Sequence, residues 1–262
     1  MGSPHHLADA AVTAAHPAAG DGNSSKAATA PARQAPIIAQ ADDLAAVGEL
    51  RAVAALLRPT LAHVTAGLAN ADTAAVLYAY ALAGTGHPAA ASAWARWAHT
   101  HHHHGPGHPT TLHALGVLAA ALLADNHPRR SAACYRDLIA ALPSLHSPTS
   151  DHILAARADR ASALHRAGSC AAAHNELTGA WHTRRAHAGD SNELTLPMLI
   201  RLAGMYRDCA DTNLATYHYW HGTHPARGQP EPLRHQVQHA ASHPPRPEHR
   251  ALCTYQPPRR TT

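Results

Sequence analysis

Three positions in the middle of the chain, Asn126, Gly168 and Ala210, are each separated by 42 residues, and the segments around them can be laid over one another. An apolar stretch with helical spacing precedes each position, and a second such stretch follows it. A fixed period in this range is typical of a solenoid of stacked helix pairs. The period therefore predicts an all-α fold, an α-solenoid, and such folds are mostly binding surfaces.

The repeat region is predicted to span residues 37–222, with about four repeats and a degenerate N-terminal unit. Within that unit, Gly48 is expected to split a helical stretch into two helices. Residues 1–36 mix Ala, Gly, Ser, Pro and His without periodicity, and residues 223–262 are rich in Pro and His. Proline interrupts helices, and low apolar content cannot offset chain entropy, so both tails are predicted to be disordered.

The charge balance argues against a nucleic-acid partner. The 21 basic and 17 acidic side chains leave a formal net charge of +4, which is weak for a domain that needs a concentrated basic face. The four cysteines form no CxxC pair, which argues against a zinc knuckle and a disulfide framework and favours free thiols in a reducing cytoplasm. No secretory signal or run of about 20 apolar residues is found, so no membrane association is expected. The Ala- and Arg-rich composition suggests a bacterial source with GC-rich coding.

Several segments carry a resemblance to a known repeat family. They are the inter-repeat segment Gly105–Leu112, the turn Ala83–Ala91, the stretch His165–Gly168 with Ala171–Ala173, and Met205–Asp211. Small residues recur at one site of each first helix (Ala79, Ala119, Ala161 and Ala203) and at one site of each second helix (Ala91, Ser131, Ala173 and Ala215). These features resemble tetratricopeptide repeats of the kinesin light chain type, whose repeats run a little over forty residues.

The resemblance implies a protein-interaction scaffold or adaptor whose first helices line a concave groove for a peptide or partner protein. The residues expected there as a partner-binding site are His113, Ser162, His165, Arg166, Arg201 and Arg207. The family's peptide-binding members carry Asn pairs in these helices, and this chain has small and cationic side chains in their place. Because Arg pairs with carboxylates in a bidentate manner, the expected ligand is an acidic peptide or a C-terminal carboxylate.

One dense histidine run, His101, His102, His103 and His104, is a candidate for weak metal binding, which in a flexible loop would be adventitious. It lacks the fixed spacing and supporting contacts of a structural zinc site, and no cofactor is expected. None of the common catalytic motifs is present, so the chain is predicted not to be an enzyme. Asp159 is expected to pair with Arg130 or Arg166.

Two alternatives to the scaffold remain open at this stage. One is a transcription-linked regulatory domain, for which only Ala41–Leu68 could hold a helix-turn-helix. The other is a metal- or pH-responsive sensor built on the 26 histidines, many of which would change charge between about pH 7 and 5. The aromatic residues Trp94, Trp97, Tyr217, Tyr219 and Trp220 are expected to cover the repeat ends, and could also seal a homodimer.

Overall fold

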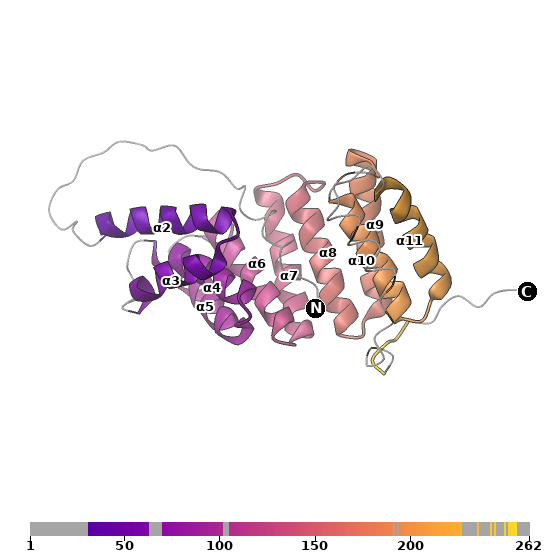
Figure 1. The fold of residues 1–262 in the computed structure, drawn as a ribbon, viewed down its shortest axis with the longest axis horizontal. Coiled ribbons are helices and arrows are strands. Elements are labelled where there is room, and N and C mark those ends of the chain that lie inside the picture. The colour runs from indigo at the N-terminus through magenta and orange to yellow at the C-terminus, as the bar shows by residue number, and fades with distance from the viewer. Residues whose placement is uncertain are drawn as a thin grey trace, which may run out of the picture. The chain divides into compact units, whose positions relative to one another are not determined.

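The computed structural model describes residues 31–62, 70–101, 105–190, 192, 194–226, 235, 242, 244, 249 and 251–255. The chain divides into two compact units after Leu145. The described residues contain helices and no strand, which confirms the all-α fold (Figure 1). Most of the tails predicted at 1–36 and 223–262 lies outside the described residues, as do His102, His103 and His104.

Unit 1 consists of three consecutive helix pairs. Their bounds are α2 (Pro31–Ala46) and α3 (Leu50–Leu61), α4 (Ala71–Gly84) and α5 (Pro88–Thr100), and α6 (Pro109–Ala124) and α7 (Pro128–Ala141), followed by a 3-10 turn at Leu142–Ser144. Each helix packs on the next, and the first helices also contact each other, α2 on α4 and α4 on α6. The degenerate N-terminal unit is therefore a true helix pair, and it begins at Pro31 rather than at the predicted residue 37.

Unit 2 consists of two further pairs, α8 (Asp151–Arg166) with α9 (Cys170–Ala188) and α10 (Thr195–Asp208) with α11 (Thr212–Ala226). The two first helices, α8 and α10, touch each other, and α9 packs against α10. This layering is the arrangement that the 42-residue period predicts, since each pair repeats the contacts of the pair before it.

In each of the five helix pairs, the turn after the first helix contains a residue with left-handed backbone. These residues are Gly48, Gly86, Asn126, Gly168 and Ala210, with φ of 78°, 88°, 58°, 85° and 64°. The next amide then donates to a carbonyl five residues back, as from His127 to Leu122 at 2.8 Å and from Ser169 to Leu164 at 2.9 Å. This Schellman arrangement satisfies carbonyls that the helix end would leave unpaired. The three positions that define the period are thus the turn residues of their pairs.

Small side chains hold the two helices of each pair close together. The four residues predicted for this role on the first helices are each 0% exposed: Ala79, Ala119, Ala161 and Ala203. Their partners Ala91, Ser131 and Ala173 are also 0% exposed, and Ala215 is 4% exposed. In the α6–α7 pair the approach is close enough for the Ser131 hydroxyl to donate to the Ala119 carbonyl at 2.7 Å.

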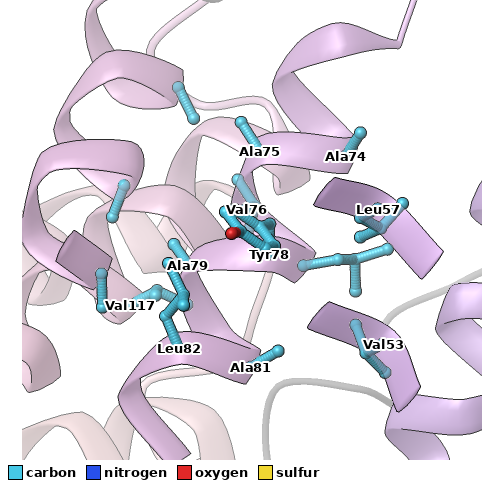
Figure 2. Packing of buried hydrophobic residues seen from close by; sticks show 14 of the residues in the cluster. Val53, Leu57, Ala74, Ala75, Val76, Tyr78, Ala79, Ala81, Leu82 and Val117 are labelled. Atoms are coloured by element: carbon cyan, nitrogen blue, oxygen red, sulfur yellow. The ribbon is translucent and has the colours of Figure 1, made fainter. Parts of the chain in front are cut away.

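The core of unit 1 is built mainly from alanine and medium-sized aliphatic residues (Figure 2). Val53 and Leu57 of α3 face Ala74 and Tyr78 of α4, and all four are buried. Trp94 and Trp97 pack against this core, with Trp94 edge-on to Tyr78 at 5.5 Å between ring centroids. In unit 2, by contrast, Tyr217 and Trp220 on α11 are exposed, and their predicted role in covering the repeat end stays a prediction.

Asp72 lies inside the first turn of α4, which begins at Ala71 after the left-handed Asn70. There its carboxylate accepts from the Thr73 amide at 2.8 Å. None of the described helices is long and apolar enough to cross a membrane.

Ala210 is the one turn residue among the five that carries a Cβ without the local hydrogen-bonding side chain of Asn. A left-handed conformation costs such a residue about 1–2 kcal/mol. We therefore expect Ala210→Gly to raise the free energy of unfolding by about 0.5–1.5 kcal/mol, measured by urea denaturation. The control Ala55→Gly, at an exposed position in the middle of α3, should lower the free energy of unfolding by about 1 kcal/mol. A destabilising Ala210→Gly would contradict the assignment of strain at this turn.

His218 of α11 generates a pH prediction for unit 2. It is 8% exposed and stacks on Tyr206, and burial, with smaller effects of His221 and His182, lowers its pKa to about 4. The unfolded chain, with a histidine pKa near 6.5, binds the proton more tightly. The stability that neutral His218 contributes is therefore present above pH 6.5 and is lost as the pH falls towards 4.

Replacing His218 by Phe keeps a stacked ring and removes the proton-binding site. We expect the loss of stability between pH 6.5 and 4 to shrink by about 1–3 kcal/mol in His218→Phe. Urea midpoints measured across this range test the expectation. An unchanged pH slope would show that His218 does not bind the proton differently in the two states.

Candidate functional site

Of the six residues predicted to face a groove, five are partly exposed and one, His165, is buried. On α6, His113 shares its side of the helix with Gly116, Ala120 and Leu123, which are also partly exposed. In unit 2 the corresponding partly exposed residues, which we call the first-helix face, are Ser162, Arg166, Ile200, Arg201, Gly204 and Arg207. The helical spacing of these residues therefore places them on a common side of α8 and of α10.

His113 lies where the N-terminal helix approaches α6. Burial lowers the pKa of the His113 imidazole, and the carboxylate of Asp42 on α2 raises it in part. Asp42 must therefore lie near the His113 side chain in unit 1. His113 of α6 thus has the carboxylate of Asp42 on α2 as an electrostatic neighbour.

Arg201 is engaged within unit 2. Its guanidinium donates to the Asp159 carboxylate at 2.6 Å, and the two side chains are 32% and 13% exposed. The residues are 42 positions apart, so they occupy equivalent places on α10 and α8. Sequence analysis named Arg130 or Arg166 as partners of Asp159. The structure pairs Asp159 with Arg201, because the repeat brings first helices side by side.

Arg207 is held in a similar way. It donates to the Tyr219 hydroxyl of α11 at 3.1 Å and to the Asp208 carboxylate at 3.4 Å, and its side chain is only 17% exposed. Arg201 and Arg207 therefore stabilise contacts between the helices of unit 2. A carboxylate ligand on this face would have to share them with Asp159 and Tyr219.

His165 is 5% exposed, so it lies inside unit 2 and not on its first-helix face. Its Nε2 is 3.5 Å from the Cys209 sulfur, and its ring stacks on His249 with 3.9 Å between centroids. The prediction of His165 as a groove contact does not fit this burial. The α8 helix turns this position towards the inter-helix turns instead.

His165 belongs to a buried cluster with Cys170, Cys209 and His249. The cysteines are 0% and 6% exposed and His249 is 6% exposed. The His249 Nε2 lies 3.2 Å from the Cys170 sulfur and 3.6 Å from the Cys209 sulfur. All four possible ligand atoms lie within 4.8 Å of one another, and no other group of this kind occurs in the described residues.

Two further residues border this cluster. The His174 Nε2 lies 3.8 Å from the Cys209 sulfur, and burial lowers the pKa of His174 to about 4. Cys253 interacts with both buried thiols. Burial raises the pKa of the Cys170 and Cys209 thiols, so without a cation nearby both stay protonated at neutral pH.

The cluster was not found from the sequence, because its members come from three separated segments. His165 and Cys170 flank the turn between α8 and α9, Cys209 follows α10, and His249 lies beyond α11. The only local signals were the spacings His165-x4-Cys170 and His249-x3-Cys253, which are too common to predict a site. The predicted run at His101 is different. The ring of His101 stacks on Trp97 at 5.1 Å, and its neighbours in the run lie outside the described residues.

Comparison with known proteins agrees with the repeat architecture. No protein-family model matches the sequence, and no curated protein matches it. Solved structures do match. TPR-like repeats described as those of a kinesin light chain from Podosopora anserina superpose with a TM-score of 0.65 at 16% identity, covering 77% of this chain and 99% of theirs. A form of those repeats with a single substitution gives a TM-score of 0.65 at 15% identity, over 75% of this chain and 95% of that one.

A third structure, BtubC (BKLC) from P. vanneervenii, superposes with a TM-score of 0.53 at 16% identity and covers 89% of this chain and 97% of its own. Identities this low establish the fold alone. The chain therefore has the all-α fold of tetratricopeptide-like repeats of the kinesin light chain type, as the resemblance predicted, and that fold is in general a protein-interaction scaffold.

Proposed function

We propose that this chain is an adaptor that binds a peptide or partner protein on the side lined by the first helices of its repeats. The observation that carries the proposal is the first-helix face of unit 2, where small side chains alternate with arginines at helical spacing. Small residues leave room for a bound backbone, and arginines supply donors for carboxylates. No catalysis is proposed for it.

The ligand that suits this face is an acidic peptide or a free C-terminal carboxylate. Arg201 donates one N–H to Asp159, but a guanidinium has five N–H donors. A ligand carboxylate can therefore share Arg201 with Asp159. Gly204 lies one turn further along α10, and a Cβ placed there would make only ordinary contacts with Arg207 and Tyr219.

The setting of this function is proposed to be the cytoplasm. All four cysteines are free, which is typical of proteins kept in a reducing compartment. A homodimer remains an expectation. Tyr217 and Trp220 on α11 are 53% and 58% exposed, and aromatic residues of this kind are enriched at protein interfaces.

Arg201→Gln tests the proposed ligand class. A peptide library displayed with free C-termini, and again with amidated C-termini, would be selected on the full chain. We expect selection of acidic or free-carboxylate peptides, and an affinity about tenfold lower in Arg201→Gln, since a charge-assisted hydrogen bond is lost. Isothermal titration with one selected peptide measures the change.

Arg160→Gln is a matched control. Arg160 lies on α8 and, like Arg201, forms an ion pair, with Glu176 at 2.9 Å. The two side chains are 29% and 12% exposed, close to the values for Arg201 and Asp159. Its partner belongs to α9, so the pair lies on another side of the helix. The control should keep the peptide affinity. Equal losses in both variants, or none in either, would refute the proposed binding face.

A further inference from the structure

The distances in the buried cluster are those of a metal coordination shell. In a tetrahedral zinc site with Zn–S near 2.3 Å and Zn–N near 2.0–2.1 Å, sulfur and nitrogen ligands lie about 3.6 Å apart. Three of the sulfur-to-nitrogen distances in the cluster are 3.2, 3.5 and 3.6 Å. Three ligand-atom distances therefore match a tetrahedral site, and all four ligand atoms of His165, Cys170, Cys209 and His249 lie within 4.8 Å of one another.

The ligand set selects the kind of ion. Two thiolates and two imidazoles are the common set of structural zinc sites, whereas Mg²⁺ and Ca²⁺ require oxygen ligands. All four residues are buried, so the set is closed and leaves no position for a substrate. This composition points to Zn²⁺ in a structural role.

The segment that supplies His249 is attached to unit 2 by further contacts. The Thr254 hydroxyl and amide both donate to the Gly168 carbonyl, at 2.8 and 3.3 Å. The Tyr255 hydroxyl donates to the Asp211 carboxylate at 3.0 Å. Gly168 and Asp211 belong to the turns that follow α8 and α10, so His249 and residues 251–255 bridge these turns beside the cluster.

We propose that unit 2 binds one Zn²⁺ through the side chains of His165, Cys170, Cys209 and His249, and that the ion fastens the described residues 251–255 across the turns that follow α8 and α10. Binding deprotonates both thiols, so the sulfurs bond to the ion as thiolates and two protons pass to the solvent. No electrons are transferred. The site is independent of the first-helix face proposed above.

Cobalt(II) titration of the full, reduced and chelator-treated chain tests this site. Thiolate-to-cobalt charge-transfer bands arise from cysteine ligands, so Co²⁺ bound only by the histidine run does not produce them. We expect one equivalent of Co²⁺ to give bands of a tetrahedral site with two thiolates, and one equivalent of Zn²⁺ to remove them. A variant with His101, His102, His103 and His104 replaced by Ser should behave in the same way.

The variants Cys170→Ser, Cys209→Ser and His249→Asn should lose the tight site, whereas Cys253→Ser should keep it. His249→Asn changes only the C-terminal segment and leaves the helices intact, so it keeps the test valid if a cysteine variant fails to fold. Absence of thiolate bands in the native chain, or bands that survive Cys170→Ser and Cys209→Ser, would refute the site. Loss of the bands in Cys253→Ser would refute this ligand assignment.

Gly168→Ala tests the proposed fastening separately. A Cβ at Gly168 would collide with the backbone carbonyl of Leu252, so the C-terminal segment would be displaced, and a left-handed Ala is strained as well. We expect Zn²⁺ affinity to fall at least tenfold, measured by competition with a chromophoric chelator.

Gly86→Ala is the matched control, because Gly86 has nearly the same φ, 88° against 85°, and nothing lies within 4 Å of its added Cβ. It should lose stability through the same backbone strain and keep its Zn²⁺ affinity. In hydrogen exchange, Zn²⁺ should protect residues 251–255 of the native chain and not of His249→Asn. Unaltered affinity in Gly168→Ala, or unprotected amides with Zn²⁺ bound, would refute the fastening.

Discussion

The left-handed residue that ends each first helix is the constraint on which the rest of this structure depends. It reverses the chain within a few residues, and its Schellman hydrogen bonds replace those that the helix end would lose. Five turns of this kind recur in the described residues, at Gly48, Gly86, Asn126, Gly168 and Ala210. Because each turn has the same geometry, each pair presents the same faces, and pairs can stack without a specific sequence at every contact.

The same turns place the chemistry of unit 2. His165 and Cys170 flank the turn at Gly168, and Cys209 directly precedes the turn at Ala210. Equivalent positions of neighbouring repeats come together when first helices pack, and the Arg201–Asp159 pair demonstrates the same effect on the first-helix face. The ion pair and the approach of Cys209 to His165 and Cys170 therefore follow from one geometric cause, the stacking of α10 on α8, and the segment after α11 adds His249.

Close packing through alanine has a consequence for stability. Alanine strongly favours helix but buries little apolar area, so each pair contributes less hydrophobic stabilisation than a Leu-rich pair would. Polar contacts between the helices of unit 2 therefore account for a larger share of its stability. The Arg160–Glu176 and Arg207–Tyr219 contacts are two such links, and the proposed zinc ion would be a third, with a free energy contribution that depends on the ion's availability.

The sequence by itself determined the helical class, the repeat period, the turn positions and the small residues of the helix contacts. These are local or periodic properties, and helix propensity, left-handed turn residues and buried alanines can each be identified from a short window. Only the tertiary structure decided which side chains meet. It buried His165, paired Arg201 with Asp159, and brought Cys170, Cys209 and His249 together from segments up to 79 residues apart. No local sequence pattern encodes those contacts, because they depend on how the repeats stack and on where the segment after α11 packs against unit 2.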